Sequence, residues 1–211
     1  MQEKKLYHHL NNFADWVIRI ILVNFLVIVT MLPIVTIIPA LTSGYKIMSD
    51  ALDKKEPPIF KTFFKTFKED IVNKIIVSIV VIAILAVSFY NFKLYSNLII
   101  EKPTIWYSLG YYVVLTLIIA VAMIALYLPL IFTERQGLEI VEVFKLAFFI
   151  AGKFFFRTML VFLTLVIPYI MFLDPILILL FVFMGVSIPL LLNALITKKA
   201  REFLQQMEGN K

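Results

Sequence analysis

The residues that could do chemistry in this chain are few and scattered. It contains no cysteine, and its two histidines, His8 and His9, are adjacent, so on a helix they would point to different faces and would not form a metal pair. Glu139 and Glu142 fit a solvated helix face better than an acid–base pair. No Walker A loop, H-E-x-x-H or G-x-S-x-G pattern occurs. We therefore expect no catalytic residue, no metal and no cofactor.

Polar residues within long apolar stretches form a second candidate set. They are Asn24, Thr30, Ser78, Ser88, Thr116, Thr164, Ser187 and Asn193. Such groups form hydrogen bonds between membrane helices, and the alternative is that they line a path for a solute. Apart from Arg19, near one edge of the first stretch, no charge interrupts the middle of these stretches. This argues against a transporter that couples to protons or sodium through a buried carboxylate.

The composition identifies the environment of these residues. Hydrophobic residues make up 62% of the 211 positions and charged residues 16%, against roughly 45–50% and 25% in soluble domains. Stretches of about 18 or more apolar residues predict membrane-spanning helices. We predict an all-α membrane protein, a bundle of about five transmembrane helices with amphipathic connector helices, forming one domain over residues 1–211. The predicted spans are 16–38, 74–92, 107–132, 154–173 and 176–196, with connectors at 40–73 and 133–153 and a tail at 197–211.

The first connector contains a basic, aromatic segment. After a short predicted helix at 42–55 and the breaker Pro57-Pro58, apolar residues recur at helical spacing with lysines on the other side. The candidate contacts to lipid or a partner are Lys61, Phe63, Phe64, Lys65, Phe67 and Lys68. The segment lies either on the membrane surface or packed under the bundle. A stripe of this kind beside a span favours membrane over nucleic acid, so we expect no nucleic-acid partner.

Prolines recur near one end of the odd-numbered spans. Pro33, Pro129 and Pro189 each follow an aliphatic residue there, and a proline disturbs the preceding helical turn. The candidate helix-kink residues are Leu32, Pro33, Thr36, Pro39, Pro129 and Pro189. This pattern is either a parallel internal repeat or a coincidence, because proline is common in membrane helices.

The distribution of lysine and arginine predicts an orientation. On the five-span scheme, fifteen of the twenty lie on the C-terminal side and five, at 4, 5, 19, 93 and 102, lie on the other. The positive-inside rule then places the N-terminus outside and the C-terminus in the cytoplasm. The segment 1–15 mixes both signs of charge and precedes a long apolar run, so we expect no cleaved signal peptide.

Several motifs together carry a family resemblance. They are Leu32-Pro33-Ile34-Val35-Thr36 with Pro39-Ala40, Tyr45, the run from Phe60 to Lys68, Leu128-Pro129-Leu130, and Asn193 ahead of a basic tail. In these motifs the chain resembles the YesL-type family of bacterial integral membrane proteins, which is largely uncharacterised and looks like a companion of carbohydrate ABC uptake systems. The resemblance implies a bacterial inner-membrane location and supplies no catalytic residues.

These observations support two main hypotheses. The first is a non-enzymatic accessory or regulatory protein that binds membrane lipids and subunits of a carbohydrate ABC importer. The second is a small-solute transporter or channel that acts as a homo-oligomer, since five spans with few polar groups make a poor pore alone. A membrane-embedded lipid enzyme is a third alternative, disfavoured because clustered carboxylates and histidines are missing.

Overall fold

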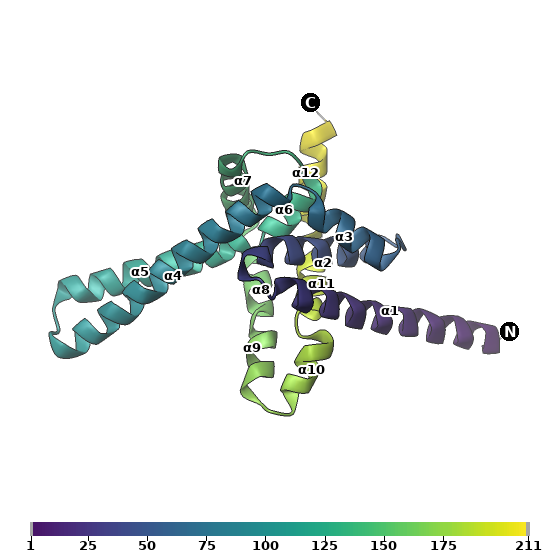
Figure 1. Ribbon diagram of the computed structural model, residues 1–211, viewed down its shortest axis with the longest axis horizontal. Coiled ribbons are helices and arrows are strands. Elements are labelled where there is room, and N and C mark those ends of the chain that lie inside the picture. The colour runs from purple at the N-terminus through teal and green to yellow at the C-terminus, as the bar shows by residue number, and fades with distance from the viewer. Residues whose placement is uncertain (1, 210–211) are drawn as a thin grey trace.

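The computed structural model describes the backbone of residues 2–209 and the side chains of residues 13–207, and the described part of the chain is helical without a strand (Figure 1). Its helices are α1 (Gln2–Met31), η1 (Ile34–Thr36), α2 (Ile37–Leu52), α3 (Ile59–Lys68), α4 (Ile71–Glu101), α5 (Ile105–Ala125), α6 (Leu128–Glu134), α7 (Ile140–Lys153), α8 (Phe155–Thr164), α9 (Val166–Leu173), α10 (Leu177–Met184), α11 (Ser187–Ile196) and α12 (Lys198–Gly209). The all-α class is confirmed.

Three arms diverge from a central core (Figure 1). One arm is α1, the second is the hairpin of α4 and α5, and the third is the hairpin in which α8–α9 descends and α10–α11 returns. The core lies around α2, which packs against α1, α3, α4, α6 and α11. Its largest fully buried side chains include Tyr45, Phe63 and Tyr127.

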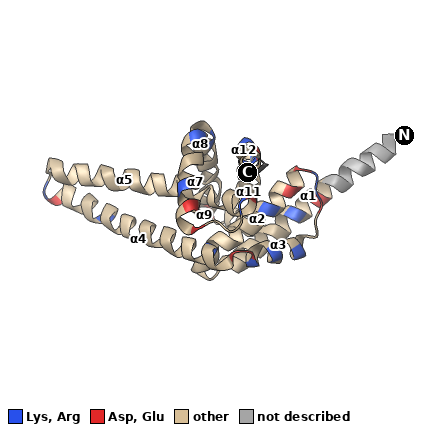
Figure 2. Cartoon of the chain, turned by 90° about the horizontal axis from the view of Figure 1, so that it is seen from above, with Lys and Arg blue, Asp and Glu red and all other residues tan. Residues whose placement is uncertain are grey.

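Four segments are long and apolar enough to cross a membrane, and the pair α10–α11, bent by 58°, makes a fifth if it is one span. The four are Phe13–Met31, Ile71–Glu101, Ile105–Glu134 and Phe155–Leu173. Their number agrees with the predicted five and is compatible with a multi-pass membrane protein. Charged side chains gather near the core and at the helix ends, and the α4–α5 arm carries few of them away from its tip (Figure 2).

The first span ends earlier than the sequence predicted. Helix α1 stops at Met31, not at 38, and α2 begins at Ile37, five residues before the predicted start. Between them the chain reverses, and the Thr36 hydroxyl donates to the Thr30 carbonyl oxygen at 2.5 Å. Pro33 explains the early stop, because it lacks an N–H and disfavours the α conformation of the residue before it.

Helix α2 then runs back along α1 at close range. A Cβ atom placed on Gly44 would lie 2.7 Å from Leu190 Cδ1 and 2.8 Å from Val27 Cγ2, so any larger residue would push these side chains aside where α1, α2 and α11 meet. The reversal brings Lys54, after the end of α2, to the same pocket as Arg19 of α1. The charge count assigned these two residues to opposite sides of the membrane, and the structure places them at one end of the α1–α2 pair.

The second span is longer than predicted, and the loop expected at 93–106 is mostly helical. Helix α4 continues to Glu101, and only residues 102–104 connect it to α5. No glycine or proline interrupts 93–101, so nothing stops the helix before Pro103. The extension packs against α5: a Cβ atom placed on Gly110 of α5 would lie 2.6 Å from Tyr95 Cε1. The tight turn predicted at Asp174-Pro175 is confirmed, since the Asp174 carboxylate accepts the Ile176 N–H at 2.7 Å.

The prolines mark helix starts rather than kinks within helices. Pro39, Pro129, Pro168 and Pro189 are each the second or third residue of α2, α6, α9 and α11. A proline is tolerated in the first turn because its missing N–H has no intrahelical acceptor there. The predicted fourth and fifth spans are therefore each built from two helices, and the third from α5 and α6.

Candidate functional site

Helix α3 carries the basic, aromatic segment, and its inner face fixes it to the core. The extended backbone of Pro58 precedes its first turn. Phe63 and Thr66 are buried, and Phe67 packs beside them with its ring 6.3 Å from that of Phe63. At the other end, Lys74 Nζ donates to the Thr66 carbonyl oxygen at 2.6 Å, which satisfies a free carbonyl in the last turn of α3. Helix α3 is thus packed on α2 along one side.

The outer face of α3 exposes two aromatic rings among three lysines. Phe60 and Phe64 are 55% and 44% exposed, one helical turn apart. Lys61, Lys65 and Lys68 are exposed around them. Lys65 lies 3.8 Å from the carboxylate of Glu69, an exposed pair that we expect to contribute little to stability. We call Phe60, Lys61, Phe64, Lys65 and Lys68 the α3 surface.

The structure divides the predicted contact residues between two roles. Lys61, Phe64, Lys65 and Lys68 lie on the α3 surface, whereas Phe63 is fully buried and Phe67 half-buried in the core. A single stripe of aromatic residues had suggested one contact face. The stripe is about 100° wide, and only one edge of it faces the core, so Phe63 and Phe67 are covered while the other edge stays exposed. Phe60 was missing from the predicted contacts, although its spacing of four from Phe64 places both on one face.

A second site is the break between α10 and α11, where the side chain of Asn24 from α1 is inserted. The Asn24 amide donates to the carbonyl oxygens of Phe181 at 3.1 Å and Val182 at 2.7 Å. Its carbonyl oxygen accepts the N–H groups of Val186 at 2.8 Å and Ser187 at 3.0 Å. The break frees backbone groups in an apolar region. A fully buried asparagine satisfies three of them and adds a second bond to the Phe181 carbonyl oxygen, which also accepts the Gly185 N–H.

Three helix breaks meet at one small cavity of about 130 Å³. Pro129, Pro168 and Pro189, which follow the α5–α6, α8–α9 and α10–α11 breaks, all line it. Its polar side chains are Thr164 and Asn193, and Asn193 donates to the Leu126 carbonyl oxygen at 3.1 Å across the α5–α6 break. We call this the junction. Two of the predicted kink residues, Pro129 and Pro189, meet here; Leu32, Pro33, Thr36 and Pro39 belong to the α1–α2 reversal.

A chain of buried hydroxyls leads from the junction to the C-terminal helix. Thr197 Oγ1 donates to the Asn193 carbonyl oxygen at 2.7 Å and lies 2.9 Å from the Tyr45 hydroxyl. Burial raises the pKa of the Tyr45 phenol above its usual range, so the phenol stays protonated. Nearby, Arg201 Nη2 pairs with the Asp53 carboxylate at 2.9 Å, which ties α12 to the end of α2.

Polar residues of the spans were predicted to form interhelical hydrogen bonds, and three of them do. These are Asn24, Asn193 and Ser78, whose hydroxyl accepts the Ile38 N–H at 3.1 Å. Within the described residues, no group of three or more histidine or acidic side chains could hold a metal ion. The side chains of His8 and His9 lie outside the part that the structure describes.

Comparison with known proteins gives one match. No curated protein matches this chain, and no solved structure matches it. Residues 20–92, which run from α1 through α2 and α3 into α4 and so include the α3 surface, match the model of an uncharacterised family described as a protein of unknown function, DUF624.

Proposed function

We propose that this chain is a non-enzymatic membrane accessory protein that docks a transporter subunit on its α3 surface. The observation that carries the proposal is the division of α3 into a buried face and an exposed one. Phe63 and Phe67 hold the helix on the core, so Phe60 and Phe64 are presented in a fixed arrangement. Preorganised side chains lose less conformational entropy on binding than flexible ones do.

The chemistry of the α3 surface specifies its partner. Aromatic anchors supply contact area at the centre of an interface, and the three surrounding lysines favour an acidic partner face. The resemblance to YesL-type proteins leads us to propose a subunit of a bacterial carbohydrate ABC importer as that partner. Membrane lipids surround the spans, and their anionic headgroups compete for the same lysines.

The proposed location is the bacterial inner membrane, with the C-terminus in the cytoplasm. For the α8–α11 hairpin, Arg157, Lys198 and Lys199 lie at the open end, whereas Asp174 is the charged residue of the closed end. The positive-inside rule assigns the open end to the cytoplasm.

The test is recovery of partners from native membranes in mild detergent, followed by mass spectrometry. We expect importer subunits with the wild-type chain and a loss of at least about tenfold for the double variant Phe60→Ala, Phe64→Ala, since each buried aromatic anchor is worth about 2 kcal/mol or more. Phe155→Ala removes a similarly exposed ring on α8, 52% exposed, and is the matched control. Equal recovery by the double variant and the wild type would refute docking at this surface.

The junction supports a second candidate, a small-solute transporter that acts as a homo-oligomer. Solute sites in membrane transporters are built where broken helices meet, and three breaks meet here. Solute flux into liposomes that contain only the purified chain would favour this function. Absence of flux, together with recovery of importer subunits, would favour the accessory function.

A further inference from the structure

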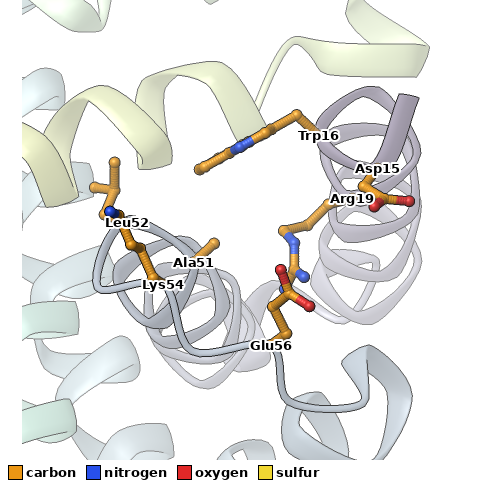
Figure 3. Close-up of a pocket in the computed structure, with 7 residues that line it drawn as sticks. All are labelled: Asp15, Trp16, Arg19, Ala51, Leu52, Lys54 and Glu56. Carbon is orange, nitrogen blue, oxygen red and sulfur yellow. The ribbon is translucent and has the colours of Figure 1, made fainter. Parts of the chain in front are cut away.

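The amino end of the α1 span and the link between α2 and α3 enclose a polar pocket of about 490 Å³ (Figure 3). Asp15, Trp16 and Arg19 form one wall, and Lys54 and Glu56 belong to the other. A second hollow of about 370 Å³ shares Asp15, Arg19 and Glu56 with it and extends past the start of α3. This pocket is separate from both the α3 surface and the junction.

The charges of the pocket are balanced and held apart. It is lined by two cations, Arg19 and Lys54, and two carboxylates, Asp15 and Glu56. Asp15 stands four residues before Arg19, a spacing at which opposite charges on a helix can pair, yet no ion pair joins them. In Figure 3 the guanidinium of Arg19 and the carboxylate of Glu56 point toward one another from opposite walls. Lys54 lies across the hollow from this pair, and the Asp15 carboxylate points outward from α1 (Figure 3).

Arg19 has a donor that the protein leaves unused. Its Nη1 atom is buried and has no hydrogen-bond partner in the structure. Buried polar atoms nearly always have a partner, and a charged one is especially costly to leave without one. Because Nη1 is closed off from solvent, a ligand in the pocket meets the rest of the guanidinium, and an anionic oxygen matches that group best.

Lys54 is held at the pocket by the backbone around it. Its φ of 58° is in the left-handed region, and its N–H donates to the Ala51 carbonyl oxygen at 3.1 Å. The next residue, Lys55, is bonded to Asp50 through its backbone and does not line the pocket. The turn therefore places only the first of two adjacent lysines at the pocket. Lys55, with the same charge and a neighbouring position, serves as the control for variants of Lys54.

The position of the pocket indicates where its ligand comes from. It lies at the end of the spanning-length segment Phe13–Met31, where lipid headgroups are found, and Trp16 is a residue type enriched at that level. Exposed apolar side chains such as Ile18 and Phe25 continue from it along α1 and offer a surface for acyl chains.

We propose that this pocket binds the phosphoethanolamine headgroup of a membrane phospholipid. The phosphate lies between Arg19 and Lys54, and the ammonium donates to the carboxylate of Glu56. A headgroup with only a negative charge meets this carboxylate unfavourably, because like charges repel at short range. A trimethylated ammonium has no N–H to donate to it, so phosphocholine binds less well.

The test is lipid binding to delipidated, purified protein, measured by native mass spectrometry with phosphatidylethanolamine, phosphatidylcholine and phosphatidylglycerol of equal chain length. We expect phosphatidylethanolamine to bind at least about tenfold more tightly than the other two. Arg19→Gln and Lys54→Gln should each weaken its binding, and Lys55→Gln should leave it unchanged. Glu56→Gln should shift the preference toward phosphatidylglycerol; this readout stands even if an Arg19 variant fails to fold.

Chain-free glycerophosphoethanolamine distinguishes the source of the ligand. Much weaker binding of this compound supports a membrane lipid, and equal binding assigns a water-soluble ligand with the same headgroup chemistry. Equal affinity for all three lipids, or the same response to Arg19→Gln and Lys55→Gln, would overturn the proposal.

Discussion

Replacing Asn24 by alanine removes four hydrogen bonds from the break between α10 and α11. The two N–H groups and the Val182 carbonyl oxygen lie in an apolar region, where no lipid group can replace the lost partner, whereas the Phe181 carbonyl oxygen keeps the Gly185 N–H. At about 0.6 kcal/mol each, a typical value between membrane helices, the four bonds contribute about 2.4 kcal/mol; the upper value of about 1.7 kcal/mol each gives about 7 kcal/mol. For a chain of this size the lower figure corresponds to a fall of about 5–10 °C in Tm.

The assay is thermal unfolding in detergent, followed by the fraction of monodisperse protein that remains after heating. Asn91→Ala is the matched control, because the Asn91 amide donates to the Val87 carbonyl oxygen of its own helix at 2.8 Å and bridges no break. We expect a large fall in Tm for Asn24→Ala and a change near zero for Asn91→Ala. Equal small changes in both variants would show that Asn24 does not hold the break together, and the reasoning would fail.

Three further predictions follow from the packing and charges. Gly44→Ala should lower the free energy of unfolding by about 1–3 kcal/mol through overpacking. The control is Gly152→Ala, where an added Cβ meets nothing within 4 Å, and it should be neutral or stabilising. Thermal unfolding measures both variants. Lys74→Ala removes the hydrogen bond to the Thr66 carbonyl oxygen and should destabilise the packing of the end of α3 by about 1.5–3 kcal/mol. Trypsin should then cleave within α3 faster than in the wild type, and an unchanged cleavage rate would contradict this. Burial raises the pKa of Tyr45, so as pH rises the unfolded chain releases this proton before the folded chain does, and the free energy of unfolding of the wild type falls. Relative to Tyr45→Phe, which has no such proton, the wild type should lose about 1.4 kcal/mol between about pH 9 and about pH 11, measured by unfolding at each pH. A difference that stays constant over this range would contradict the shift.

The sequence predicted the class of fold because composition and long apolar runs determine it. Both the all-helical class and the four to five segments of spanning length follow from those runs. It did not predict where helices stop. A proline shows that a break is near, but whether the chain kinks or reverses depends on what it packs against. At Pro33 the chain reverses because Gly44 allows α2 to approach α1 closely.

The candidate sites show the same limit. The basic, aromatic character of α3 could be predicted from its residue types, but which ring is buried could not, because Phe63 and Phe64 differ only in the face that meets α2. Asn24 was recognised as a polar residue in a span, although its partners lie 157 to 163 positions away. The pocket between Arg19 and Lys54 depends on the chain reversal, and no local pattern encodes it.

The accessory function is tested most directly by a photo-crosslinking residue placed at position 64 in native membranes. Phe64 lies on the exposed side of α3, and position 156, 85% exposed on α8, serves as the reference. The account predicts that position 64 crosslinks to a subunit of a carbohydrate importer and that position 156 does not. If both positions give the same products, or position 64 reaches only lipid, the α3 surface is not a docking site and the central claim is contradicted.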